Sequence, residues 1–482
     1  MRSLALAEVA IRRGWSVSIV GDIAVRSVQI LHALLPEATI RTLPREHAET
    51  EVRSALSGAE IDVAHLDTYW GDFSDSGLGS VLVSNMQDGE FGVRQSTLAV
   101  DANLGAEFRF GTPDASISQI AGGRAALVRA QVRYERLRRK QPTGDAHRLL
   151  VVLGGTDPFA ATPGVVAALE GIRNPLLVTV IDSNGAPAVV EAARQSPHAV
   201  RVVPFAEDLP ALANAHDFVI TAAGTSVLDF ACMGIPMGLL CVTDNQIAGY
   251  RASIAEGIAL PLGESSLSIA PQRVADLDAL LRDRDALYQL GATGRSRVDG
   301  RGAERVVGAW ETMLDTRGSS RPTDITGWAA RPATVPDASI LYAWRNDPET
   351  RSRSRSSAEL SWDHHLEWVH QVLARDDRKL LVVERAGIPV GTVRWDHIDR
   401  NVWEVSITVA PSERGRGYGP MVLACGETAL EASAPLLLVA TIHQHNAASQ
   451  RLFTRAGYLP DSPPDGRGYL VLAKQLVKQD PK

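Results

Sequence analysis

One turn between a strand and a helix, near the C-terminal end of the chain, constrains the fold more than any other stretch. The β-branched residues 405–409 predict a strand, and residues 421–430 predict an apolar helix. Pro420 suits the first turn of that helix, where its missing N–H has no helical partner to lose. Bare backbone N–H groups and the helix dipole make such a turn an anion site, and glycine lets phosphate oxygens approach closely. The turn consists of Arg414, Gly415, Arg416, Gly417, Tyr418 and Gly419.

A second pattern follows this turn. Residues 436–442 predict a buried strand, and an Asn-x-x-Ser motif with a later aromatic residue and a Gly-Tyr pair comes next. Together with the preceding Arg-x-x-Gly-x-Gly, these motifs resemble the GNAT acetyltransferases. The resemblance implies an α+β domain with a mixed, mostly antiparallel sheet and acetyl-CoA as co-substrate. It implies a cofactor site made of Val409, Arg414, Gly415, Arg416, Gly417, Tyr418, Gly419, Asn446, Ser449 and Phe453.

Acetyl transfer needs a neutral amine, a stabilised oxyanion and a proton for the departing thiolate. Glu404, on the strand before the turn, is our candidate for the catalytic base, and a solvated strand acid is the alternative. Asn446 is expected to bind the pantetheine arm, to cap the next helix, or both. Phe453 stands where the family usually has a tyrosine acid, so we expect water to protonate the thiolate, or the thiolate to leave without help. His364 and His365 are expected to be exposed to solvent, and the alternative is that one of them faces the sugar substrate.

Composition limits the classes of protein that this chain can belong to. Its 482 residues predict two or three domains, and its net charge of −7 argues against a general nucleic-acid binder. Its three cysteines have neither metal-ligand spacing nor a disulfide pattern, so no metal is predicted. No apolar run reaches the length of a membrane span, and we expect a cytoplasmic protein. The sequence predicts no particular oligomeric state.

The first two thirds of the chain alternate helices with short apolar strands, which predicts an α/β class with parallel sheets. We expect a first Rossmann-like lobe over residues 1–140, in which 122–140 form a long basic helix. A second Rossmann-like lobe is expected over 141–315. A polar linker over 316–325 then leads to the domain over 326–482. The chain opens on a helix with no strand before it, so the first strand of the first lobe is apparently missing.

Residues of the second lobe carry another resemblance. Gly-rich turns follow two of its strands, and 234–246 run from Gly-Ile-Pro to Asp-Asn-Gln. These motifs resemble the UDP-sugar hydrolase of pseudaminic acid synthesis, a relative of the MurG-type GT-B glycosyltransferases. The resemblance implies diphosphate contacts at Gly154, Gly155, Thr156, Gly224, Thr225 and Ser226, ribose contacts at Asp229, and sugar or phosphate contacts at Asn245 and Gln246. Plain βα loops are the alternative.

The same resemblance bears on the start of the chain. In that family a strand and a Gly-x-Gly-His loop precede the helix that matches residues 1–13, and the loop histidine is the proposed catalytic base. We expect the true start to lie upstream; the alternative is a lobe that has lost this group. Asp229 stands where the family usually has glutamate, and the shorter acid can still accept hydrogen bonds from ribose.

The two resemblances predict one bifunctional enzyme. Residues 341–348 and 362–368 resemble the first helices of the acetyltransferase of the same pathway, so the C-terminal domain is expected to acetylate a UDP-amino-sugar. The N-terminal module is then expected to remove UDP, as in the synthesis of a nonulosonic acid for surface glycans. Two alternatives remain open for that module: a glycosyltransferase of the spore-coat polysaccharide type, and a non-catalytic scaffold that binds nucleotide sugars. A basic run at Arg351, Arg353 and Arg355 is either a solvated cluster or a contact for the diphosphate of this substrate.

Overall fold

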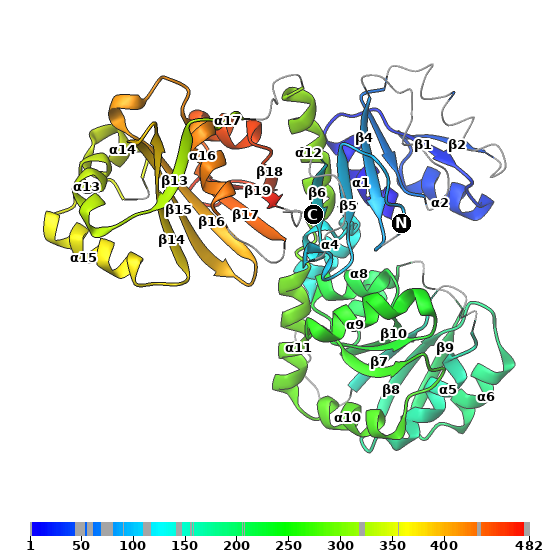
Figure 1. Ribbon diagram of the computed structural model, residues 1–482. Coiled ribbons are helices and arrows are strands. Elements are labelled where there is room, and N and C mark those ends of the chain that lie inside the picture. Colours follow the sequence, from blue (N-terminus) through cyan, green and yellow to red (C-terminus); the bar gives the residue numbers. More distant parts are fainter. Residues whose placement is uncertain are drawn as a thin grey trace.

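A computed structural model defines the architecture of the chain. It describes residues 2–43, 54, 61–68, 81–89, 91–108, 117–140, 147–154, 157, 159–204, 206, 208–317, 323–354, 356–430 and 435–476. Figure 1 shows three bodies: an N-terminal lobe, a second α/β lobe below it, and a C-terminal domain beside helix α12 (Gly302–Asp315).

The N-terminal lobe is built from parallel strands, as the alternation of helices and strands predicts. The strands form two sheets, one with the order β1-β2 and the other with the order β3-β4-β5-β6. Among the described residues, no strand pairs with both sheets to join them. The elements are α1 (Arg2–Arg12), β1 (Ser18–Gly21), α2 (Val25–Leu34), β2 (Thr39–Thr42), β3 (Val63–Leu66), β4 (Leu82–Gln87), β5 (Leu98–Asp101), η1 (Ala106–Phe108), β6 (Ser118–Ala121), η2 (Gly123–Ala125) and α4 (Ala130–Arg138).

The helix predicted over residues 122–140 is wrong in its first half. Only α4 is α-helical, and a short 3-10 turn, η2, precedes it. The backbone between them is extended because Ala126 and Val128 pack into an apolar cluster shared with the second lobe. Burial of these two side chains therefore overrides the helical tendency of the segment.

The second lobe is a doubly wound parallel sheet with the order β9-β8-β7-β10-β11-β12. Its strands are apolar on both faces because helices cover both, and β10 and β11 are buried throughout. The elements are β7 (His147–Val152), α5 (Thr162–Ala168), η3 (Leu169–Gly171), β8 (Leu176–Ile181), α6 (Pro187–Gln195), β9 (Ala199–Val203), α7 (Leu209–Asn214), β10 (Phe218–Ala222), α8 (Ser226–Met233), β11 (Met237–Cys241), η4 (Asp244–Gln246), α9 (Ile247–Ala255), β12 (Leu260–Glu264), α10 (Pro271–Leu281) and α11 (Arg284–Arg297).

The C-terminal domain has the predicted mixed sheet. Its seven strands have the order β13-β14-β15-β16-β17-β19-β18, and only the β16–β17 pair is parallel. The elements are β13 (Trp328–Pro332), η5 (Val335–Asp337), α13 (Ala338–Asn346), α14 (Pro348–Ser352), α15 (Trp362–Leu373), β14 (Arg378–Arg385), β15 (Ile388–Asp399), β16 (Val402–Val409), η6 (Pro411–Glu413), α16 (Gly419–Thr428), β17 (Leu436–His443), α17 (Ala447–Arg455), β18 (Leu459–Ser462) and β19 (Tyr469–Leu476).

Helices cover both faces of this sheet. Leu381 and Val383 of β14 belong to the same apolar cluster as Val422 of α16. Leu380 and Val382 alternate with them and pack on the other face, against side chains of α13 and α15. The two-residue period of the strand therefore sets which helix each side chain meets.

The C-terminal domain docks on the N-terminal lobe and on α12. Leu459 of β18 is buried in the apolar core of that lobe. Asp461 accepts hydrogen bonds from Arg124 of η2 at 2.6 Å and from Arg305 of α12 at 2.9 Å. Although burial alone would raise it, the pKa of Asp461 lies well below its ordinary value because of these two arginines. Helix α12, which falls inside the predicted second unit, thus packs between the first lobe and the last domain.

Candidate active site

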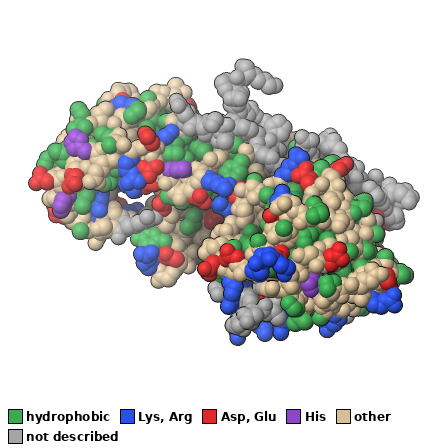
Figure 2. Space-filling view, turned by 90° about the horizontal axis from the view of Figure 1, so that it is seen from below, with side chains coloured by type: hydrophobic (Ala, Val, Ile, Leu, Met, Phe, Trp, Pro, Cys, Tyr) green, Lys and Arg blue, Asp and Glu red, His purple; other side chains and the backbone are tan. Residues whose placement is uncertain are grey.

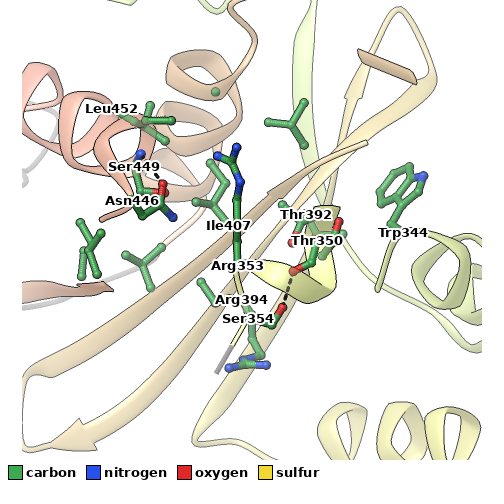
Figure 3. Close-up of a pocket in the computed structure, with 18 of the residues that line it drawn as sticks. Trp344, Thr350, Arg353, Ser354, Thr392, Arg394, Ile407, Asn446, Ser449 and Leu452 are labelled. Carbon is green, nitrogen blue, oxygen red and sulfur yellow. Dashed lines mark hydrogen bonds between the residues drawn. The ribbon is translucent and has the colours of Figure 1, made fainter. Parts of the chain in front are cut away.

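A cavity of about 1200 Å³ opens in the C-terminal domain where two neighbouring strands diverge. Strands β16 and β17 pair only at residues 402–404 and 437–439. Beyond Glu404 the two strands separate, so the inner edge of residues 405–409 faces the cavity rather than a neighbouring strand. Figure 3 shows Asn446, Ser449 and Leu452 on one side of this space and Trp344 and Thr350 on the other.

The predicted anion loop forms one end of the cavity. Gly415 and Gly417 both have φ of 76°, a conformation that side chains with a Cβ rarely adopt. Helix α16 begins at Gly419, and no side chain caps its N-terminus. Within the described residues, none of the backbone N–H groups of Arg414 through Gly419 donates to a protein acceptor. A Cβ built on Gly415 or Gly417 would meet open space. The loop therefore presents free donors to a ligand.

The two arginines of this loop differ in their surroundings. Arg414 forms ion pairs with Asp347 at 2.7 Å and with Glu349 at 3.1 Å, and its side chain lines the cavity. Arg416 lies 60% exposed beside Glu413 and is not among the lining residues. The structure thus places the Arg414 guanidinium against α14, while the backbone N–H of Arg414 belongs to the loop.

Glu404 lies at the point where β16 and β17 separate. It is paired in register with Asp396 of β15 on one side and Val439 of β17 on the other, and it is half-buried in the cavity wall. The structure thus places this carboxylate in the cavity wall, and its role as a catalytic base stays a prediction.

Helix α17 supplies the opposite wall. Asn446 is its N-cap, because the side-chain oxygen accepts a hydrogen bond from the Ser449 N–H at 3.1 Å. Ser449 and Phe453 also line the cavity, and Tyr418 and Val409 complete the set of predicted cofactor residues found there. All of the predicted cofactor residues except Arg416 therefore meet at one cavity.

Phe453 is 3% exposed, and its ring contacts that of Tyr458 at a centroid distance of 4.9 Å. Tyr458 is fully buried, and burial raises the pKa of its hydroxyl well above the ordinary value. Tyr458 therefore holds its proton tightly within the packed core, and we assign it a packing role.

We expect the substitution Phe453→Tyr to raise turnover if protonation of the CoA thiolate limits the rate. A phenol at this cavity position adds a proton donor. A general acid that acts in the rate-limiting step raises the rate by about 10²-fold or more. Steady-state kcat for acetyl transfer, compared between the variant and the wild type, measures this. An unchanged kcat would mean that thiolate protonation is not limiting.

Side chains that the sequence analysis did not assign line the other end of the cavity. His365 is 1% exposed, so the expectation of solvent exposure is wrong for this residue, whereas His364 is exposed. His365 shares the inner face of α15 with Val369 and Val372. These three positions follow the 3.6-residue period of a helix, so the sequence pattern could have predicted that His365 is buried. Its Nε2 lies 3.0 Å from the Ala338 carbonyl, and burial lowers its pKa, so the ring is neutral. Other lining residues that the sequence analysis did not assign include Trp344, Arg345, Trp368 and Arg394.

Those predicted nucleotide residues that the structure describes follow the carboxyl ends of three adjacent strands, β7, β10 and β11. Gly154 has φ of 94°, and Gly155 and Thr156 lie outside the described residues. The carboxylate of Asp157 accepts hydrogen bonds from the N–H groups of Ala161 and Thr162 at 3.0 and 2.8 Å, so it already occupies the start of α5.

The N-terminus of α8 has more unoccupied backbone N–H groups than the N-terminus of α5. Thr225 stands at its N-cap without a side-chain hydrogen bond to the helix, and in the described residues no protein group accepts from the N–H of Thr225 or Ser226. The Gly224 N–H, by contrast, donates to the Ala222 carbonyl at 2.7 Å. In η4, Gln246 accepts a hydrogen bond from the Val242 N–H at 3.1 Å, and Asn245 accepts one from the Thr243 hydroxyl. Free donors for a diphosphate are therefore found at α8.

Asp229 lies in the first turn of α8. Burial raises its pKa from an ordinary value of 3.8 to about 7, against the opposing attraction of Arg129. Because the folded-state pKa is the higher one, the stability that the protonated carboxyl contributes is complete below about pH 4 and is lost as pH rises through about 7.

The substitution Asp229→Asn should remove this pH dependence. Relative to the wild type, the variant is expected to gain about 1–3 kcal/mol in free energy of unfolding between pH 5 and pH 8. Denaturant unfolding of both proteins at the two pH values measures the difference. Equal losses of stability in both proteins would contradict the assignment.

Comparisons with known proteins relate the chain to two kinds of protein. Residues 330–459 match the family model described as "Acetyltransferase (GNAT) domain". The spore coat polysaccharide biosynthesis protein SpsG of Bacillus subtilis is 26% identical over 176 residues, which are 36% of this chain and 52% of that protein. A UDP-N-acetylglucosamine–N-acetylmuramyl-(pentapeptide) pyrophosphoryl-undecaprenol N-acetylglucosamine transferase of Alkalilimnicola ehrlichii is 32% identical over 163 residues, 32% of this chain and 45% of that protein. The chain thus spans about half the length of these curated relatives.

Solved structures resemble each part. The MurG structure of Acinetobacter baumannii has a TM-score of 0.49 at 17% identity, covering 65% of this chain and 95% of that one. The spermidine N-acetyltransferase of Vibrio cholerae, solved with CoA and spermine, has a TM-score of 0.28 at 17% identity, covering 31% of this chain and 95% of that one. The C-terminal domain thus matches the GNAT acetyltransferase model, which supports acetyl-CoA as its co-substrate.

In the described part of the chain, no cluster of three or more histidine, cysteine or acidic side chains could hold a metal ion. None of the helices described combines the length and apolar character that crossing a bilayer requires.

On the face of the second lobe seen in Figure 2, acidic and basic side chains are interspersed and do not form separate patches of one charge.

Proposed function

We propose that the C-terminal domain transfers the acetyl group of acetyl-CoA to the amino group of a sugar nucleotide. The observation that carries this proposal is the row of unpaired N–H groups from Arg414 to Gly419, which opens into the same cavity as Glu404. The loop would hold the diphosphate of CoA. The pantetheine arm would then run between β16 and β17 toward Glu404, along the wall that Asn446 and Ser449 form.

The reaction follows from this placement. Glu404, directly or through a water molecule, removes a proton from the acceptor ammonium, and the neutral amine attacks the thioester carbonyl. The new C–N bond forms and the C–S bond breaks; the nitrogen gives its second proton to water, and CoA leaves as a thiolate that takes a proton from water. Within the described residues, the inner edge of β16 has no strand partner beyond Glu404, so its backbone N–H groups are suited to stabilise the oxyanion.

A negatively charged acceptor suits the other end of the cavity. Arg353 and Arg394 both line the cavity, and Figure 3 shows their side chains extending in opposite directions. Each is paired with one acid, Arg353 with Glu349 at 2.8 Å and Arg394 with Asp396 at 2.9 Å, and a guanidinium has donors left for a second partner. A diphosphate accepts such bonds bidentately, which supports a UDP-amino-sugar as the acceptor.

For the N-terminal module we propose removal of UDP from the acetylated sugar, by attack of water at the anomeric carbon. The free N–H groups at α8, with Asp229 one turn along, support binding of the diphosphate and ribose. Glycosyl transfer is the second candidate, because the names of the two curated relatives point to polysaccharide synthesis and to a glycosyltransferase. Either activity would place the chain in the synthesis of a surface glycan, of the nonulosonic or spore-coat kind.

One experiment separates these activities. UDP-4-amino-sugar candidates are incubated with the full chain and acetyl-CoA, and the products are identified by mass spectrometry. We expect the acetylated UDP-sugar first, then free acetylated sugar and UDP. Acetylation without release of UDP would leave the N-terminal module as a scaffold, and transfer to an added acceptor with negligible hydrolysis would favour the glycosyltransferase. Absence of acetylation with every amino-sugar would contradict the proposed acetyl transfer.

A further inference from the structure

Arg414 connects the anion loop to a different element. Its guanidinium forms ion pairs with Asp347 at 2.7 Å and Glu349 at 3.1 Å, and it donates to the Thr350 hydroxyl. Asp347 is the N-cap of α14, and the other two partners lie in the first turn of that helix. The side chain of a loop residue is therefore anchored on α14, while the N–H of the same residue faces the anion site.

Helix α14 continues directly into the acceptor end of the cavity. Arg353 and Ser354 follow its last residue, and the Ser354 hydroxyl donates to the Thr350 carbonyl at 2.7 Å, as the dashed line in Figure 3 shows. Thr350, Arg353 and Ser354 all line the cavity. A displacement of α14 would therefore move the side chains that we propose contact the acceptor.

We propose that Arg414 is a positioning residue that couples the two ends of the cavity, so that CoA bound at the loop orders α14 and residues 353–354 for the acceptor. A diphosphate held by the loop fixes the backbone at Arg414, and this in turn fixes the guanidinium and the three groups that it holds. Coupling of this kind is reciprocal, so acceptor bound against α14 also tightens CoA binding. The inference rests on the acetyl transfer proposed above.

The test uses CoA as the probe and hydrogen–deuterium exchange of the segment 347–354 in the full chain as the readout. In the wild type, CoA should slow exchange of this segment about fivefold or more. In Asp347→Asn the helix cap is kept, since asparagine caps as well as aspartate, but the nearer of the two carboxylate charges that hold Arg414 is removed. This variant should bind CoA within about threefold of the wild type by calorimetry and lose the protection of 347–354.

A matched control comes from the same domain. Arg375 is another ion-paired arginine; its partner is Asp377, and its side chain is 51% exposed. Arg375→Ala should bind CoA and protect the segment as the wild type does, so a loss of protection there would overturn the inference.

The remaining outcomes decide between the inference and the proposed function. CoA that binds the wild type without protecting 347–354 would overturn the coupling alone. A tenfold or greater loss of CoA affinity in Arg414→Ala, with protection kept in Asp347→Asn, would overturn it in favour of direct phosphate contact by the guanidinium. No binding of CoA to the wild type would overturn the proposed acetyl transfer and the coupling with it.

Discussion

Replacing Gly417 with valine is expected to abolish measurable binding of acetyl-CoA. Gly417 has φ of 76°, where a β-branched side chain costs about 1–3 kcal/mol of strain and the backbone relaxes away from the native conformation. The N–H groups of the loop then no longer converge on one anion, and the new side chain enters the space that the diphosphate would occupy. We expect a loss of affinity of about 100-fold or more, measured by calorimetry.

The chain offers a matched control for this variant. Gly387, in the hairpin between β14 and β15, has φ of 78° and open space at its Cβ position, but it does not line the cavity. Gly387→Val introduces comparable backbone strain in the same domain, so it should bind acetyl-CoA as the wild type does. Equal affinity in Gly417→Val and the wild type would remove the loop from the cofactor site.

Replacing Glu404 with glutamine should lower kcat for acetylation by about 10²- to 10⁴-fold, with a much smaller change in affinity for acetyl-CoA. The amide keeps the size of the side chain but cannot accept the proton of the acceptor ammonium. The loss should be steepest near neutral pH, where an acceptor amine is mostly protonated. Initial rates measured across a pH series give both the magnitude and the shape of the effect.

Glu384 provides the control for this second substitution. It is another glutamate of the same sheet, paired with Arg331 at 2.7 Å, and it is not among the residues that line the cavity. Glu384→Gln should leave kcat within about threefold of the wild type. If Glu404→Gln retained the wild-type rate and pH profile, Glu404 would be a structural strand acid and the base would have to be sought elsewhere in the cavity.

The local structure around the candidate site was largely predictable. The strand ending at Val409, the glycine turn, the helix start at Gly419 and the cap at Asn446 all follow from short-range chemistry: β-branching, positive φ and side-chain capping. The parallel sheets of the lobes follow in the same way from the alternation of helices and strands. These signals act within about ten residues, so they can be read from the sequence without tertiary information.

Features set by distant contacts were not predictable. The extended backbone at Ala126 and Val128 depends on a core shared between two lobes, and the burial of His365 depends on how α15 meets the sheet. The contact of Arg414 with Asp347 joins residues 67 positions apart. The glycine-rich motif that contains Arg414 predicts an anion-binding turn, but it does not predict this ion pair. The pairing of Asp461 with Arg124 and Arg305 likewise became visible only once the domains were placed together.

A crystal structure of the full chain with bound CoA tests the central claim most directly. The account predicts that the diphosphate oxygens lie within hydrogen-bond distance, about 2.7–3.2 Å, of the N–H groups of Gly415, Gly417 and Gly419, with the thiol directed toward Glu404 between β16 and β17. A diphosphate bound elsewhere, with these N–H groups instead donating to carbonyls of the protein, would contradict it.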